Sequence, residues 1–156
     1  CVQLVLDSGK PHKKIEILFT IGEELYVKGS DVFDYSKVTA KQAYVLDLSE
    51  ETTFNIGTIQ GGTATNIMPD CCVLTAYETP LESKSVTDFQ KACEILGFSG
   101  ELTGTFGGSD NNSFAKNGIE GLVLSNGMYN AHSTREYTTV DDLYKGAELI
   151  GQLILL

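Results

Sequence analysis

Three acidic residues and a histidine follow short apolar stretches of this sequence, at positions where strands would end. Glu23 and Glu24 come directly after IEILFTIG, Asp47 follows AYVL, and His132 follows LVLSNG after a short loop. Carboxylates and imidazole are the ligands of hydrolytic zinc sites, in which a spare carboxylate handles the water. Because ligands collect outside the carboxyl ends of strands in α/β sheets, these four residues are the candidates for one catalytic site.

The adjacent residues Glu23 and Glu24 could have different roles. Two consecutive side chains leave the backbone in different directions, so one can bind a metal while the other reaches the water, as a general base must. Taken singly, the same residues have simpler interpretations: a solvated turn for Glu23 and Glu24, a turn or cap for Asp47, and a loop histidine for His132. Only the convergence of the strand-end positions favours a site.

Two glycine pairs add candidate substrate contacts. In FGGSDNNSFAKNG, Gly107 and Gly108 lead into a predicted helix that Ser109 or Asp110 would cap. Such a helix start presents free N–H groups to a substrate oxyanion, although a tight turn with a cap is an equal alternative. In GGTATNIMPD, Asn66 either contacts a substrate or bonds its own backbone in a bulged hairpin.

The elements that must position these residues are those of an α/β fold. KIEILFT (14–20), AYVLD (43–47) and EGLVLSNG (120–127) are short and almost continuously apolar, which predicts strands of a mixed sheet covered on both faces. Thr-rich alternation in residues 51–62 and 71–79 predicts an antiparallel pair in a smaller subdomain. Residues 1–9 fit either the last turns of a helix or a first strand.

Two predicted helices cover the sheet. The first, SVTDFQKACEILG, follows a Ser or Thr cap, ends at Gly97 and places four residues on its inner face: Val86, Phe89, Cys93 and Leu96. The second follows Thr139, a cap with Asp142 three residues later. Its predicted inner face consists of Val140, Leu143, Ala147, Ile150 and Ile154.

Composition excludes several classes of protein. The 156 residues, 42% of them hydrophobic, suffice for one domain with a core. Only 11 basic residues stand among 21 acidic ones, for a net charge of -10, which argues against nucleic acid as a partner. No apolar run approaches the length of a membrane span, and no membrane partner is expected. The four cysteines form no CxxC pair, so we expect reduced, mostly buried thiols and a cytoplasmic protein.

Taken in chain order, these stretches resemble the di-zinc aminopeptidase, carboxypeptidase and deacylase family, in particular its peptidase T-like (tripeptide aminopeptidase-like) branch. The resemblance rests on EILFTIGEELYVKGS, AYVLDLS, NIGTIQGGTATNIMPD, GGSDNNSFAKNGIEGLVLSNG and AHSTREYTTVDDL, and it covers nearly all of the chain. It implies a zinc-dependent metallopeptidase that hydrolyses short peptides, with two zinc ions in the complete site.

The resemblance also implies a role for each candidate. Glu23 matches the general base that activates a water between two zincs, Glu24 a zinc ligand, Asp47 a ligand of the other zinc, and His132 a further ligand. The asparagine that helps to hold the substrate matches Asn66. The loop beside the substrate matches four residues: Gly107, Gly108, Ser109 and Asp110.

The same resemblance predicts the domain organisation. Residues 1–49 and 84–156 would form the catalytic domain, and residues 50–83 the remnant of a lid through which a homodimer could form. The family's His-x-Asp element and its bridging Asp have no counterpart in this sequence. The lid is also short, so we expect residues to be omitted near Leu48 to Glu51 and near Glu82 to Ser85.

Two other functions fit the same residues. A deacylase of N-acyl amino acids would need no change in the core motifs, because the same metal pair hydrolyses an amide. A non-catalytic remnant domain acting as an interaction module would bind no stoichiometric zinc, and Glu24, Asp47 and His132 would then lie apart.

Overall fold

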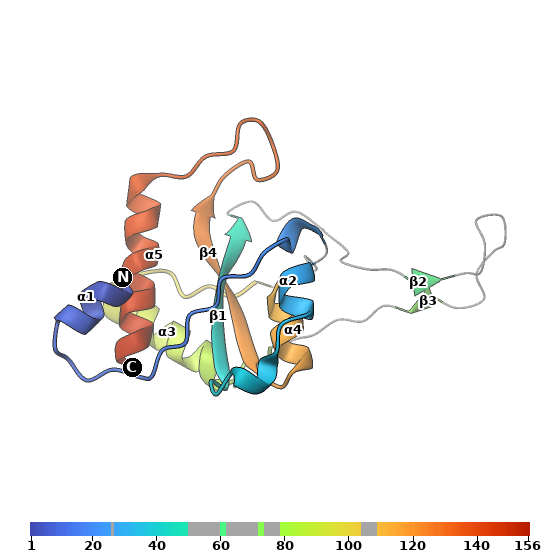
Figure 1. Cartoon of the computed structure of the whole chain (residues 1–156). Coiled ribbons are helices and arrows are strands. Elements are labelled where there is room, and N and C mark those ends of the chain that lie inside the picture. The colour runs from blue at the N-terminus through green and yellow to red at the C-terminus, as the bar shows by residue number, and fades with distance from the viewer. Residues whose placement is uncertain (26, 50–59, 62–71, 74–78, 104–108) are drawn as a thin grey trace.

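A computed structural model describes residues 1–25, 27–49, 60–61, 72–73, 79–103 and 109–156 of the chain (Figure 1). Its helices are α1 Val2–Asp7, α2 Lys28–Asp31, α3 Lys84–Leu96, α4 Asn111–Lys116 and α5 Val140–Leu155, with 3-10 turns at Glu23–Leu25 and Tyr35–Lys37. Its strands are β1 Gln42–Ser49, β2 Gln60–Gly61, β3 Cys72–Val73 and β4 Glu120–Met128. The chain is therefore of the α/β class, as predicted.

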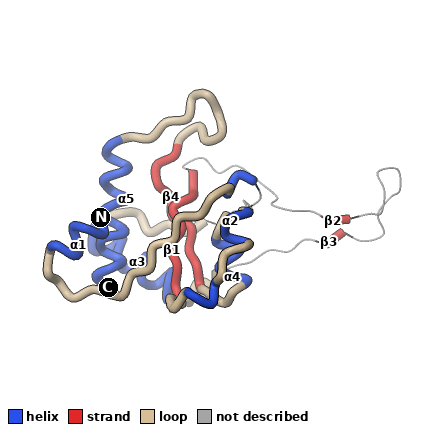
Figure 2. Tube along the Cα trace, viewed as in Figure 1, coloured by secondary structure: helices blue, strands red, loops and turns tan. Residues whose placement is uncertain are grey.

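The centre of the fold is the parallel pair β1 and β4, which confirms two of the predicted strands. Their register runs from Gln42 opposite Glu120 to Leu46 opposite Leu124. Helices α3 and α5 pack against this pair on one side, and α4 packs against it on the other with α2 beside it (Figure 2). Both faces are thus covered, which explains why the two strands are almost continuously apolar.

The core lies between the sheet and the helices α3 and α5. Ala92, Leu124 and Leu153 are its buried members. The buried side of α5 therefore runs through its second half, where Ile150 also packs against the core. The predicted inner face is wrong at its start: Val140 is 82% exposed and Leu143 is also exposed, because the first turns of α5 reach past the packed core.

Helix α3 begins and ends where the sequence predicts. The Val86 N–H donates to the Oγ of Ser83, and Gly97 adopts φ +69°, the left-handed conformation typical of a glycine after a helix. Val86 and Cys93 are buried as predicted. The Ser85 N–H donates to Glu120 Oε1 over 2.6 Å, which ties the start of α3 to the start of β4.

Helix α4 approaches the sheet so closely that the Asn111 side chain lies directly over Gly121 of β4. A Cβ added to Gly121 would lie 1.7 Å from Asn111 Oδ1, so any larger residue at this position would require the Asn111 side chain to move. On its other side α4 contacts α2 through two buried serines, whose hydroxyls Ser30 Oγ and Ser113 Oγ lie 3.2 Å apart. The start of α4 is therefore fixed relative to both β4 and α2.

Residues 14–20, predicted to be a strand, form none in the structure and are drawn as loop in Figure 2. They are held by side chains instead: the Thr39 N–H, for example, donates to Glu16 Oε2 over 3.0 Å. Phe19 is 90% exposed and Ile17 is also exposed. Apolar composition produces a strand only where a neighbour completes its hydrogen bonds, and no such neighbour is found among the described residues.

The smaller antiparallel pair is present where the structure describes it. Gln60 lies opposite Val73 and Gly61 opposite Cys72. The other residues of the predicted pair lie outside the described residues. Of the two alternatives for residues 1–9, the helix is correct, since α1 occupies Val2–Asp7.

The start of α3 also contains one of the two places where we expect omitted residues. At this place a turn runs from Pro80 to Ser83, in which the Ser83 N–H donates to Pro80 O over 2.9 Å, and α3 begins directly after it at Lys84. At the other place, residues 50 and 51 lie outside the described residues. The omission of residues, and with it the division into a catalytic domain and a lid remnant, stays a prediction.

Two further expectations concern the burial of the cysteines and the absence of a membrane span. Cys93 is a buried free thiol as predicted, whereas Cys1 is exposed. None of the described helices combines the length and the apolar composition that crossing a membrane requires.

Candidate functional site

Glu23 is presented by a rigid turn rather than by the end of a strand. Gly22, with φ +65°, takes the left-handed conformation that glycine adopts readily. Its carbonyl accepts hydrogen bonds from the N–H groups of Leu25 (3.1 Å) and Lys28 (3.2 Å). The Glu23 carbonyl accepts one from the Val27 N–H over 2.8 Å. These three hydrogen bonds fix the backbone on both sides of Glu23, and with it the direction in which the side chain leaves the backbone.

Asp47 lies near the carboxyl end of β1, at an irregularity of the ladder. The register shifts between Leu46, which is opposite Leu124, and Leu48, so Asp47 falls outside the pairing. A bulge of this kind bends the strand and redirects a side chain, and bulges are common beside active sites. The prediction that Asp47 follows the apolar part of a strand is correct.

His132 comes from the loop after β4 and meets the turn that carries Glu24. Its Nδ1 lies 3.6 Å from Glu24 Oε2. Both side chains face solvent, with 74% of His132 and 72% of Glu24 exposed. The structure therefore brings together two of the three predicted metal ligands, one from each half of the sequence.

Asp110 is the buried acid of the site. The residue is 8% exposed, and its Oδ2 accepts a hydrogen bond from the Thr20 hydroxyl. Its Oδ1 is buried and has no hydrogen-bond partner among the described residues. Thr20 lies three residues before Glu23, so this bond joins the start of α4 to the segment that leads to the candidate base. Sequence reasoning missed Thr20, because nothing in the sequence pairs residues so far apart.

The acidic side chains of the site raise one another's pKa values. Burial raises the pKa of Asp47 to about 6, and the charges of Asp110 and Glu24 add to the increase. Burial also raises the pKa of Glu23, again with contributions from Asp47 and Glu24. His132 opposes the increase at both residues. These couplings require the groups to lie near one another, and a bound cation would offset their mutual repulsion.

The first N–H groups of α4 bond within their own turn, as in the alternative of a tight turn with a cap. The Asn111 N–H donates to Ser109 Oγ over 3.2 Å. The N–H groups of Asn112 and Ser113 donate to the carbonyls of Ser109 and Asp110, each over 3.0 Å. These donors are already used within the turn. Contacts of Ser109 and Asp110 with a substrate stay predictions.

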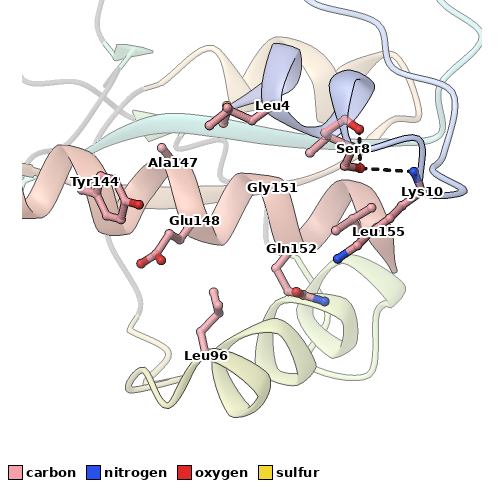
Figure 3. Close-up of a pocket in the computed structure, with 12 residues that line it drawn as sticks. Leu4, Ser8, Lys10, Leu96, Tyr144, Ala147, Glu148, Gly151, Gln152 and Leu155 are labelled. Atoms are coloured by element: carbon pink, nitrogen blue, oxygen red, sulfur yellow. Dashed lines mark hydrogen bonds between the residues drawn. The ribbon is translucent and has the colours of Figure 1, made fainter.

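Two grooves on the described part of the chain do not contain the candidate base. Figure 3 shows one of about 290 Å³ between α1 and α5, lined by Leu4, Ala147 and Leu155 among others. Another, of about 440 Å³, lies beside Phe19 and Thr20. Within the described residues the site is thus an open cluster of charged side chains.

Comparison with known sequences decides the family. A sequence model of the peptidase family M20/M25/M40 matches residues 1–156, the whole chain. The chain belongs to this family. Membership makes the protein a peptidase, and so a hydrolase, as the resemblance implied. The chain is also 22% identical to the uncharacterized protein YqjE of Bacillus subtilis (strain 168), in an alignment that covers 98% of this chain and 67% of the relative.

Two solved structures share the fold of this M20-family chain. The aminopeptidase PepT of Bacillus cereus ATCC 10987 has a TM-score of 0.79 at 20% identity. A tripeptidase of Staphylococcus aureus subsp. aureus Mu50 also has a TM-score of 0.79, at 18% identity. Each comparison covers 99% of this chain and 67% of the other one. The α/β fold described above is therefore that of M20 peptidases.

M20 peptidases generally use metal ions, and the donors at this site fit one in part. Within the described ranges, no group of three or more His, Cys, Asp or Glu side chains is arranged to hold an ion. The spacing of Glu24 and His132 nevertheless suits a shared ion. Two ligands of a tetrahedral zinc lie roughly 3.4 Å apart, and these two atoms lie 3.6 Å apart.

Three predicted substrate contacts of this M20 peptidase cannot be placed. Asn66, Gly107 and Gly108 lie outside the described residues. Of the predicted substrate loop, only Ser109 and Asp110 have a described position, beside the candidate base and metal ligands.

Proposed function

We propose that the protein is a zinc-dependent exopeptidase of the peptidase T type that hydrolyses short peptides. The observation that carries the proposal is the pairing of Glu24 with His132 beside Glu23 and Asp47, in a chain of the M20 peptidase family. A solvated turn and a surface loop would give no reason for an acidic turn and the loop after β4 to meet at this point.

In this proposal Glu24 and His132 hold one zinc ion, and Asp47 holds a second. The donor chemistry supports it, since carboxylate oxygen and imidazole nitrogen are both common zinc ligands. When bound, the two ions would polarise the scissile carbonyl and lower the pKa of the attacking water. The raised pKa of Asp47 supports a cation here as well, because a bound cation would favour the charged form that burial and the nearby carboxylates disfavour.

Glu23 acts as the general base. Its carboxylate takes a proton from the attacking water and passes it to the nitrogen of the leaving amine. The raised pKa of Glu23 suits this task, because a base works best when its pKa approaches the working pH. The Gly22 turn holds the Glu23 backbone, so the carboxylate needs little reorganisation to reach the water.

The remaining assignments complete the proposal. Asn66 and the loop that contains Gly107, Gly108, Ser109 and Asp110 contact the peptide substrate. Residues 50–83 belong to a lid through which two copies could pair. The protein works in the cytoplasm, where the free thiols of Cys1 and Cys93 would stay reduced.

Replacement of Glu23 by Gln tests the proposal. Glu23→Gln removes the base but leaves Glu24, so tripeptide hydrolysis in the presence of zinc should fall by about 100-fold or more while zinc remains bound. Glu94→Gln makes the same change at an exposed position of α3 and should alter neither property. Undiminished hydrolysis by Glu23→Gln would overturn the assignment.

Activity assays and zinc binding of the wild-type protein distinguish this function from the two alternatives. Release of amino acids from tripeptides supports the exopeptidase. Hydrolysis of N-acyl amino acids with no action on tripeptides would indicate a deacylase on the same scaffold. Absence of both activities together with absence of stoichiometric zinc would indicate a non-catalytic domain.

A further inference from the structure

The residue that meets Glu24 sits at the tip of a closed hairpin. After β4, the backbones of Tyr129 and Tyr137 pair in both directions, with N–H to carbonyl distances of 3.0 and 3.1 Å. The rings of these two tyrosines stack, with centroids 4.9 Å apart and planes 14° apart. Residues 129–137, called the His132 hairpin below, thus have a defined base on which His132 depends for its position.

Within the His132 hairpin, His132 has an unfavourable backbone conformation that neighbouring hydrogen bonds stabilise. His132 has φ +61°, a left-handed conformation that residues other than glycine rarely adopt. Its N–H donates to Glu136 Oε2 over 2.9 Å, and the Ser133 hydroxyl donates to the Asn130 carbonyl over 2.7 Å. A conformation of this kind persists only where surrounding contacts impose it, so the base of the hairpin must resist opening.

The base of the hairpin is anchored to helix α5 by one carboxylate. Asp142 Oδ2 accepts a hydrogen bond from the Tyr129 hydroxyl over 3.2 Å and a second one from the Thr139 hydroxyl. The Asp142 N–H donates back to Thr139 Oγ1 over 3.1 Å, which caps α5. A Cβ on Gly127 would lie 2.4 Å from Asp142 Cβ, so β4 and the first turn of α5 are in direct contact at this point.

We propose that Asp142 is a positioning residue, which acts through Tyr129 to hold His132 beside Glu24 before any metal binds. The carboxylate joins the cap of α5 to the base of the hairpin, and the stacked tyrosines carry that restraint toward the tip. The role in metal binding rests on the proposed function. The restraint on the hairpin does not, and it is measurable in the metal-free protein.

The first test removes single hydroxyl groups and follows the hairpin without metal. In Tyr129→Phe, which lacks the hydroxyl that donates to Asp142, the amide hydrogen of Tyr137 should exchange with solvent about ten times faster, measured by NMR. Tyr144→Phe makes the same change at an exposed tyrosine of α5 and should leave that rate unchanged. Equal exchange rates in wild type and Tyr129→Phe would overturn the inference.

A second pair of variants addresses the carboxylate itself. Asp142→Ala removes the acceptor, whereas Asp141→Ala removes an equivalent exposed charge from the first turn of α5. Faster exchange of the Tyr137 amide in Asp142→Ala, at a temperature where α5 stays folded in both variants, supports the anchor. The same acceleration in both variants would overturn it, since the effect would then belong to the helix end in general.

Zinc affinity provides the readout that connects the anchor to the site. By competition with a chromophoric chelator, Tyr129→Phe should bind zinc about ten times more weakly than wild type, as is typical when the support of a ligand is lost. Tyr144→Phe should bind it as wild type does. If wild type binds no zinc, the proposed function fails, while the exchange measurements still decide the restraint on the hairpin. Unchanged zinc affinity in Tyr129→Phe would overturn the role of the anchor in metal binding.

Discussion

His132 Nδ1 lies 3.6 Å from Glu24 Oε2, although one residue belongs to the turn before α2 and the other to the hairpin after β4. The hairpin follows β4, whereas the turn with Glu24 comes before β1 and follows no strand among the described residues, so the pairing is not set by the register of the sheet. Two exposed side chains form the best-defined part of the candidate metal site.

Zinc should stabilise the folded protein through this pair. At a zinc concentration one hundred times the dissociation constant, binding to the folded state alone adds about 2.7 kcal/mol to the free energy of unfolding. His132→Gln should lose most of this increase, measured as the zinc-dependent rise in Tm. The other histidine of the chain supplies the control, since His12→Gln should retain the full rise and chelation should reverse it. Equal rises in both variants would show that zinc binds elsewhere.

The bond from Thr20 to Asp110 should contribute to stability. Thr20→Val removes the hydroxyl and leaves the buried Asp110 Oδ2 without this donor, which costs about 1 to 3 kcal/mol of the free energy of unfolding. Thr20→Ser keeps the donor and should lose much less. Urea unfolding of the two variants measures the difference. A cost as large for Ser as for Val would mean that the lost methyl group, and not the hydrogen bond, is responsible.

Asp88 should make stability depend on pH in the acid range. Although burial opposes the change, hydrogen bonds from Lys13 and Lys84 lower the pKa of Asp88 below its ordinary value of 3.8. Because the folded state binds this proton more weakly than the unfolded state, the stabilisation is complete above about pH 4 and is lost as the pH falls through the lowered pKa. Asp88→Asn should therefore cost about 1 kcal/mol at pH 7, since both lysines are partly exposed.

The pH dependence of the effect of Asp88→Asn tests this explanation. The difference in free energy of unfolding between wild type and Asp88→Asn should shrink as the pH is lowered from 5 to 2, measured by urea unfolding. Asp7→Asn, at an exposed end of α1, should show no such difference. A cost that stays constant over this range would assign the effect to packing around residue 88.

Leu124 and Leu46 lie opposite each other in the sheet but differ in burial. Leu124 is 3% exposed and Leu46 is 49% exposed. Leu124→Ala should cost about 2 to 5 kcal/mol, because it leaves a cavity against Ala92 and Leu153. Leu46→Ala should cost well under half as much. Similar costs, measured by urea unfolding, would show that the helices α3 and α5 do not cover the sheet as described.

Local patterns were sufficient to predict several elements. The strands β1 and β4 follow from continuous apolar runs, and α3 follows from a serine cap and a terminal glycine. Each of these signals acts only on residues next to it in the chain. Residues 14–20 have an equally apolar pattern but form no strand, because strand formation requires a partner that no local pattern supplies. The exposed start of α5 is a similar case, since burial depends on where the sheet ends.

For the candidate site, the sequence alone determined the chemical types: adjacent glutamates in a glycine turn, an aspartate after an apolar run, and a histidine after another. The tertiary structure decided which of them meet. It joined Glu24 to His132, buried Asp110 against Thr20, and placed Asp142 beneath the hairpin. These contacts join residues that are far apart in the chain or belong to different elements, and they arise only when the sheet and its helices pack, so no spacing in the sequence encodes them.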